Sequence, residues 1–242
     1  MASRSIGVLR LCCAAVCGII RGAMRTFVTN GWAANEHAWD LCAFGRDRIF
    51  SYVEQLDGLP EKAIEEDDGK VLLVGWSMGG SCALRLACRY ADKVAGLVLL
   101  AATPRMMADG GTGWNGMTPR RLEALSYGLR LTGGAGFFGT PEGVENPYDS
   151  TDEANLERGL KYLLETDLRA DLERTFGGEE GAMPVAILQS ERDGIVRPSN
   201  AGYLAKIFPS AKVTMLPGSD HAISLSAPEL VDRTVREIAA LI

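Results

Sequence analysis

The chain contains only two histidines, and its six cysteines form neither a C-x-x-C pair nor a spacing typical of zinc ligands. It also lacks a phosphate-binding glycine pattern and any internal repeat. A formal net charge of −6 without a long basic run argues against nucleic acid as a main partner. We therefore expect a protein that needs no metal or other cofactor. The cysteine pattern favours a reducing compartment, the cytoplasm.

The first 23 residues differ in character from the rest of the chain. Arg4 and Arg10 precede an apolar run at residues 11–20 that looks like the core of a short signal peptide. The run is too short to span a bilayer, Arg21 ends it, and no clear small-x-small cleavage site follows. We interpret residues 1–23 as an extension outside the fold rather than an export signal.

We expect the protein to be a monomer and not to bind membranes.

The most informative stretch is Gly-Trp-Ser-Met-Gly-Gly at residues 75–80. An apolar β-type run precedes it at residues 70–74, and small and apolar residues at helical spacing follow at 81–90. This strand, turn and helix form the context that a G-x-S-x-G nucleophile elbow requires. Glycine tolerates the dihedrals of such a sharp turn, and a side chain at Gly75 or Gly79 would collide with neighbouring backbone. Ser77 is therefore expected at the edge of a sheet, above a helix N-terminus.

Strand patterns alternate with helical patterns along the rest of the chain. Apolar runs predict strands at residues 24–29, 48–53, 71–74, 94–101, 185–188 and 212–216. Helices are expected near residues 59–64, 77–90, 200–208 and 228–242. The alternation predicts an α/β fold with a doubly wound, mostly parallel sheet. The length of 242 residues suits one such domain with an insertion.

An insertion is expected between residues 104 and 181, where helical patterns interrupt the strands. Leucines mark one face of a helix at 118–131, residues 133–147 read as a loop, and Ser150 with Glu153 forms a capping-box pattern before another helix. A further helical stretch covers 167–176. We expect residues 104–181 to form a cap over the strand ends, and residues 24–103 with 182–242 to form the core. Such strand ends are where parallel sheets bind ligands.

A serine is a poor nucleophile unless a base takes its proton and a third group orients that base. His221 lies after the last predicted strand, where the order serine, acid, histidine places the base. His37 precedes the elbow in a polar loop and reads as a surface or pocket-rim residue. Asp193, followed by glycine and two apolar residues, is our choice for the acid, with Glu191 as the alternative and Asp220 as a weaker third choice.

The oxyanion of a tetrahedral intermediate needs preorganised hydrogen-bond donors. The amide of Met78, directly after the nucleophile at a helix N-terminus, is one candidate. The second is expected in the loop after the first strand, where Trp32 follows Gly31. Trp32 and Met78 would then also contact the substrate.

These residues resemble the α/β-hydrolase superfamily and, within it, the pimeloyl-[acyl-carrier protein] methyl ester esterases of biotin synthesis. The resemblance runs from residue 24 to the C-terminus with gaps. It rests on Asn30-Gly31-Trp32, the 75–80 motif, Trp114-x-Gly116-Met117, Thr166-Asp167-Leu168-Arg169, Asp193-Gly194-Ile195-Val196 and His221-Ala222.

The resemblance implies a triad of Ser77, Asp193 and His221, with oxyanion amides at Trp32 and Met78. It also implies hydrolysis of the methyl ester of a dicarboxylic acyl chain that a carrier protein holds. That carrier is acidic, so a local basic patch is required on this acidic protein. The candidate contacts are Arg120, Arg121, Arg130, Arg158 and Lys161.

The chain also departs from the family pattern. Asn30 stands where a histidine is usual, which bears on the oxyanion loop, and the region 41–58 is compressed. The alternative activities are a general short-chain carboxylesterase, a thioesterase or a carbon–carbon hydrolase, because one fold hosts many chemistries. A non-catalytic binding protein with a hydrolase-like fold is the alternative from another class.

Overall fold

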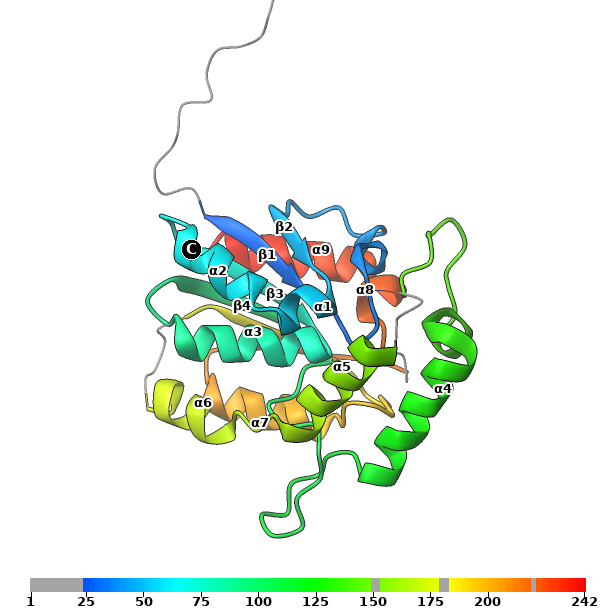
Figure 1. The fold of residues 1–242 in the computed structure, drawn as a ribbon. Coiled ribbons are helices and arrows are strands. Elements are labelled where there is room, and N and C mark those ends of the chain that lie inside the picture. Colours follow the sequence, from blue (N-terminus) through cyan, green and yellow to red (C-terminus); the bar gives the residue numbers. More distant parts are fainter. Residues whose placement is uncertain (1–23, 149–152, 179–182, 219–220) are drawn as a thin grey trace, which may run out of the picture.

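The computed structural model describes residues 24–148, 153–178, 183–218 and 221–242 (Figure 1). The expected extension at residues 1–23 therefore lies outside the described residues, as do Ser150 of the predicted capping box and Asp220. Within the described part of the chain, no helix combines the length and the apolar character that crossing a membrane requires.

Among the described residues, six strands form one sheet in the order β2-β1-β3-β4-β5-β6, and all five neighbouring pairs are parallel. β3, which leads into Ser77, lies inside the sheet and is buried along its whole length. Because both faces are covered, its sequence is continuously apolar instead of alternating. The strands are β1 (Arg25–Thr29), β2 (Arg48–Phe50), β3 (Val71–Trp76), β4 (Val94–Leu100), β5 (Val185–Ser190) and β6 (Lys212–Leu216).

Helices cover both faces of the sheet, so the core has two layers (Figure 1). One apolar cluster joins α2 (Leu59–Glu66), α3 (Met78–Arg89), α6 (Arg169–Phe176) and α7 (Ser199–Ile207) to one face. The other cluster joins the 3-10 helix η1 (Glu36–Trp39), α8 (Ile223–Ser226) and α9 (Pro228–Ala239) to the opposite face.

α4 (Pro119–Phe138) and α5 (Glu153–Glu165) lie at the edge of the sheet toward which the strands point (Figure 1). A third apolar cluster joins their leucines to the loop after β1 and to α1 (Tyr52–Leu56). α6 has a different position, because Leu168 and Leu172 pack in the cluster on the sheet face. The segment between β4 and β5 thus contributes both to the sheet edge and to a face of the core.

Two predicted elements have different bounds in the structure. The strand expected at 48–53 ends at Phe50, because Ser51 and Glu54 form a reciprocal capping box that begins α1. The loop expected at 133–147 begins late, since α4 extends to Phe138 across a break at Gly133, where φ is 66°. Glycine accepts this left-handed φ without a steric penalty.

The predicted bounds of α3 and β4 agree with those in the structure within one or two residues.

Cys82 is buried in the core and Cys88 packs against it, as expected of small apolar side chains. Burial raises the pKa of each of these two thiols to about 11. They are therefore protonated and unreactive near neutral pH.

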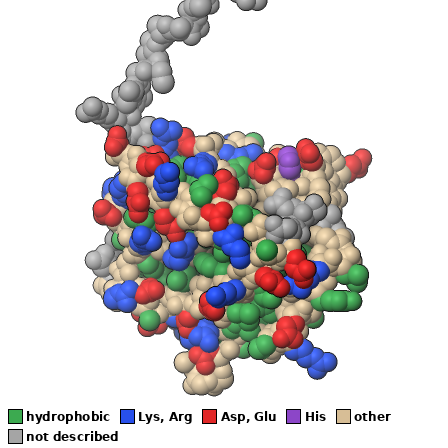
Figure 2. All heavy atoms as spheres, in the orientation of Figure 1, with side chains coloured by type: hydrophobic (Ala, Val, Ile, Leu, Met, Phe, Trp, Pro, Cys, Tyr) green, Lys and Arg blue, Asp and Glu red, His purple; other side chains and the backbone are tan. Residues whose placement is uncertain are grey.

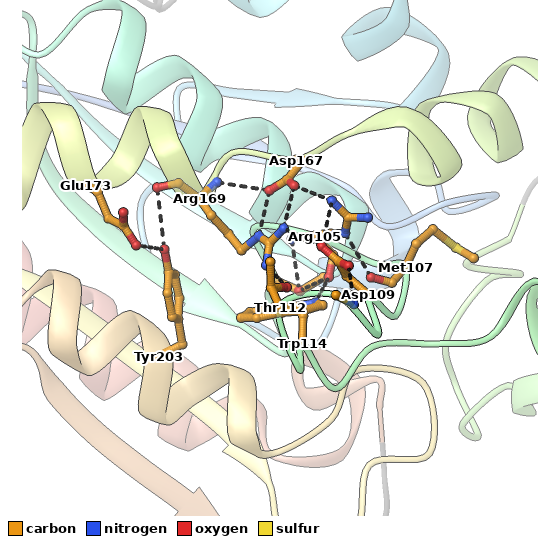
Figure 3. A network of polar contacts seen from close by, with 11 residues as sticks. Arg105, Met107, Asp109, Thr112, Trp114, Asp167, Arg169, Glu173 and Tyr203 are labelled. Atoms are coloured by element: carbon orange, nitrogen blue, oxygen red, sulfur yellow. Dashed lines mark hydrogen bonds and ion pairs between the residues drawn. The ribbon is translucent and has the colours of Figure 1, made fainter.

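A polar network joins the segment after β4 to the start of α6 (Figure 3). Asp167 accepts hydrogen bonds from Arg169, at 2.8 and 2.9 Å, and from Arg105. Arg169 also donates to Asp109 at 3.1 Å, and its guanidinium lies 5.3 Å from the centre of the Trp114 ring. The Asp-Leu-Arg of the 166–169 motif thus holds the loop that leaves β4 against α6.

Removal of the Asp167 charge is expected to lower the free energy of unfolding by about 1–2 kcal/mol at pH 7, because two arginines lose their shared partner. The hydrogen bonds from Arg169, and then the one from Arg105, hold the pKa of the Asp167 carboxyl well below its ordinary 3.8. This carboxylate therefore stabilises the fold above about pH 4, and its contribution is lost as the pH falls further. Urea unfolding of wild type and Asp167→Asn should differ by a constant amount from pH 7 to pH 5 and converge below pH 4.

Asp171→Asn is the matched control, because Asp171 lies on α6, shortly after Asp167, and forms an exposed pair with Arg174. We expect that substitution to change the free energy of unfolding by less than about 0.5 kcal/mol. Equal effects of the two substitutions would contradict a structural role for the Asp167 network.

Candidate active site

Ser77 occupies the turn between β3 and α3 with φ 56° and ψ −118°, a conformation that residues other than glycine rarely adopt. Its amide donates to the carbonyl of Leu100 at 2.9 Å, and its carbonyl accepts from the amide of Ser81 at 3.2 Å. Such strain persists only where the surrounding structure fixes the backbone. The hydroxyl is thereby directed out of the sheet edge, as the motif predicts.

The glycines around Ser77 allow three segments of backbone to approach closely. A Cβ at Gly75 would lie 2.7 Å from the carbonyl oxygen of Gly79, and a Cβ at Gly79 would lie 2.1 Å from that of Thr29. The expected collision is confirmed. Neither glycine has a left-handed φ, however, so space and not dihedral freedom is what requires glycine at both positions.

Ser77, His221 and Asp193 meet in one hydrogen-bonded row. The Ser77 Oγ lies 2.8 Å from His221 Nε2, and His221 Nδ1 lies 2.8 Å from Asp193 Oδ2. The side chains of His221 and Asp193 are 6% and 0% exposed. Because a carboxylate only accepts hydrogen bonds, Nδ1 donates to Asp193 and Nε2 is left to accept from the serine hydroxyl.

The Asp193 carboxylate is held by its own loop. Its Oδ1 accepts from the amides of Ile195 at 2.8 Å and Val196 at 3.0 Å, and its Oδ2 accepts from Gln189 Nε2 at 3.2 Å. Glu191, the alternative acid, is exposed. The structure therefore brings Asp193, and not Glu191, to the histidine.

The loop of His221 is attached to the nucleophile strand by a contact that the sequence did not reveal. Trp76 Nε1 donates to the carbonyl of His221 at 2.8 Å, and its ring centre lies 5.8 Å from the centre of the imidazole. In the sequence, the one sign that Trp76 contributes to the site is its position directly before the nucleophilic serine. Gln189 lies four residues before Asp193 and likewise carried no recognisable pattern.

Asn30, a departure from the family pattern, has a structural role at the end of β1. Its Oδ1 accepts from Trp39 Nε1 at 2.6 Å, its Nδ2 donates to the carbonyl of Phe50 at 3.1 Å, and its own carbonyl accepts from Gln55 Nε2 at 3.0 Å. These buried contacts fix the start of the loop that carries Trp32.

Trp32 is buried and lines the small cavity above Ser77. Its indole packs against α5 at Gly159, where a Cβ would lie 2.5 Å from Trp32 Cδ1 and Nε1. This contact of Gly159, like those of Trp76 and Gln189, was not evident from the sequence. The roles of the Trp32 and Met78 amides as oxyanion donors stay predictions.

The cavity above Ser77 measures about 20 Å³, roughly the space that one water needs. Its wall is mostly apolar and comes from the β1 loop, the nucleophile turn, the loop after β5 and the two helices at the sheet edge. The residues that line it are Gly31, Trp32, Trp76, Ser77, Met106, Leu125, Leu129, Leu163, Ile195 and His221. In the described ranges, no group of three or more His, Cys, Asp or Glu side chains could hold a metal ion.

His37 does not line this cavity. Its Nδ1 lies 2.8 Å from Asp40 Oδ2, and its Nε2 lies 3.6 Å from Glu145. The hydrogen bond with Asp40 raises the pKa of His37 above its ordinary 6.5. This agrees with the expected surface position.

The five candidate carrier contacts have different surroundings. Arg130 pairs with Glu153 and Glu157, Arg158 pairs with Asp57, and Lys161 lies 4.0 Å from Glu165. Arg121 donates to the carbonyl of Gly194 at 3.0 Å, and Arg120 is exposed on α4. Whether any of them binds a carrier stays a prediction.

Residues 24–234 match the model of the Alpha/beta hydrolase family. A pimeloyl-[acyl-carrier protein] methyl ester esterase of Vibrio vulnificus (strain CMCP6) is 27% identical over 212 residues, covering 80% of this chain and 79% of that protein. The esterase of the same name from Nitrosomonas europaea is 27% identical over 234 residues, covering 83% and 89%. An esterase from Exiguobacterium antarcticum has the same fold, with a TM-score of 0.69 at 19% identity over 89% and 92% of the two chains.

Replacement of Gly79 by alanine is expected to lower the free energy of unfolding by about 3 kcal/mol, because the new methyl group meets the backbone of β1. Gly202→Ala is the matched control, since a Cβ at that helical position has no heavy atom within 4 Å. That control is expected to be neutral or stabilising by up to about 1 kcal/mol. Urea unfolding of both variants measures the difference, and equal stabilities would contradict the close approach of β1 and α3.

Proposed function

Because the chain belongs to the alpha/beta hydrolase family, we propose that it is a serine carboxylesterase with Ser77 as nucleophile, His221 as base and Asp193 as the group that orients the base. The observation that carries this proposal is the buried row of 2.8 Å contacts from Ser77 through His221 to Asp193. A serine and imidazole at this separation are within the range for proton transfer.

In the proposed reaction, Ser77 Oγ attacks the ester carbon while His221 Nε2 takes its proton. The resulting oxyanion would accept from the amides of Trp32 and Met78, the latter at the N-terminus of α3. As the bond to the alkoxy group breaks, His221 returns the proton and the alcohol leaves. Water, activated by the same imidazole, then attacks the acyl-enzyme, and the acid and free Ser77 are released.

The substrate that we propose is the methyl ester of a pimeloyl chain attached to an acyl-carrier protein, and the proposed role of the reaction is in biotin synthesis. The names of the two relatives, each 27% identical to the chain, support this choice, as does the 166–169 motif. The carrier protein would be the macromolecular partner and the cytoplasm the compartment, in keeping with the free thiols of Cys42, Cys82 and Cys88.

The surface charge bears on how a carrier protein would bind. Figure 2 shows basic and acidic side chains interspersed on the visible face, with hydrophobic side chains among them. Arg130, Arg158 and Lys161 each have a carboxylate partner. An acidic carrier would therefore have to compete with these internal pairs, which lowers the gain from each contact.

A second candidate is a carboxylesterase for short acyl chains. The cavity of about 20 Å³ above Ser77 favours it, because a long chain fits only if the surrounding side chains move. This activity would use the same three catalytic residues.

The decisive experiment is complementation of a biotin auxotroph that lacks its methyl esterase, with wild type and Ser77→Ala. We expect growth with wild type alone, because loss of the nucleophile lowers kcat by at least about 10⁴-fold. A folded wild-type protein that hydrolyses p-nitrophenyl acetate but does not restore growth would support the short-chain esterase. Absence of turnover with every ester would favour a binding protein.

Asp193→Asn is expected to lower kcat by about 10⁴-fold with little change in stability, because the amide can donate to Nδ1 and favours the wrong imidazole tautomer. Glu191→Gln is the control, since Glu191 is exposed and does not contact His221. Turnover of p-nitrophenyl acetate measures both variants. A larger loss in Glu191→Gln than in Asp193→Asn would exclude Asp193 as the orienting acid.

A further inference from the structure

A second hollow, of about 230 Å³, lies beside the cavity of Ser77, between α4 and the loop after β5. Leu125 and Ile195 line both spaces. These two apolar side chains therefore form a partition between the nucleophile and the outer hollow. The residues that line the outer hollow are Met117, Arg121, Ala124, Leu125, Gly194 and Ile195.

The size of the inner cavity limits where an acyl chain can lie. About 20 Å³ holds roughly one water, so the carbons beyond the reacting ester must extend past the wall of the cavity. The side chains of Leu125 and Ile195 are held by apolar packing alone, because neither can form a hydrogen bond. A rotation of these side chains would join the two spaces into one apolar passage.

Arg121 is the only charged residue that lines the outer hollow among the described residues. Its Nη2 donates to the carbonyl of Gly194 at 3.0 Å. No carboxylate of the described residues lies within ion-pair distance of this guanidinium, whereas Arg130 and Arg158 each have such a partner. A guanidinium has five N–H donors, so Arg121 retains donors for an anion.

We propose that the outer hollow is the mouth through which the acyl chain reaches Ser77, and that Arg121 binds an anionic group at the far end of the chain. The substrates are thus esters whose acyl chain carries a negative charge opposite the reacting ester. That charge is a free carboxylate in a diacid monoester, or a phosphate where a phosphopantetheine arm holds the chain. This inference rests on the proposed esterase activity.

The test compares two methyl esters of equal chain length, monomethyl pimelate and methyl heptanoate, which differ in the terminal carboxylate. We expect Arg121→Gln to lower the ratio of their kcat/KM values about tenfold, because a hydrogen-bonded charge contact is lost, and to do so through the KM of monomethyl pimelate. Arg121→Lys should restore part of the ratio. The ratio cancels any change in folding or in the Asp193 loop, since both esters use the same triad.

Arg174→Gln is the matched control, because Arg174 is an exposed arginine on α6 outside both cavities. It removes the same charge and should leave the ratio unchanged. Arg120→Gln tests whether the general potential of α4 is responsible. If that variant lowers the ratio as much as Arg121→Gln does, direct binding by Arg121 is excluded.

Thioesters of monomethyl pimelate with pantetheine and with phosphopantetheine identify the source of the anion. A wild-type preference for the phosphorylated arm that Arg121→Gln loses would assign the phosphate, and equal rates would assign the carboxylate. If wild type hydrolyses both methyl esters and Arg121→Gln has the same ratio, the inference is wrong and the esterase proposal stands. If wild type hydrolyses neither these esters nor p-nitrophenyl acetate, both fail.

Discussion

The close contact of backbone at Gly75, Gly79 and Thr29 is the constraint on which the candidate site depends. It allows β3 to turn directly into α3, and this turn holds Ser77 in its strained conformation. A side chain at either glycine would separate the strand from the helix and move the hydroxyl. The position of the nucleophile is therefore set by the packing of the backbone atoms on either side of it.

Parallel strands explain why three distant residues meet. β3, β5 and β6 end at the same edge of the sheet, so the loops that carry Ser77, Asp193 and His221 all begin at that edge. Buried hydrogen bonds then fix two of these loops. Trp76 of β3 donates to the carbonyl of His221, and the carboxylate of Asp193 accepts from Gln189 of β5 and from two amides of its own loop. The sheet provides proximity, and these contacts provide orientation.

The fold class and the superfamily could be predicted because apolar periodicity and the elbow motif are local patterns, and both are confirmed. The choice of Asp193 over Glu191 depended on the turn at Gly194, again a local signal. The contacts of Asn30, Gly159 and Arg121 could not be predicted, because each joins segments that are apart in sequence. The continuation of α4 from Gly133 to Phe138 was missed, because the glycine indicated the end of the helix and not a break within it. The domain boundaries and the carrier contacts stay predictions.

The absence of a side chain at Gly159 also couples α5 to Trp32. The indole lies flush against the helix backbone there, and Leu163 on the same helix lines the cavity of Ser77. A displacement of α5 by an incoming acyl chain would therefore alter the polarity around this indole. With Trp39, Trp76 and Trp114 replaced by phenylalanine, the emission of Trp32 would report such a displacement without an attached dye.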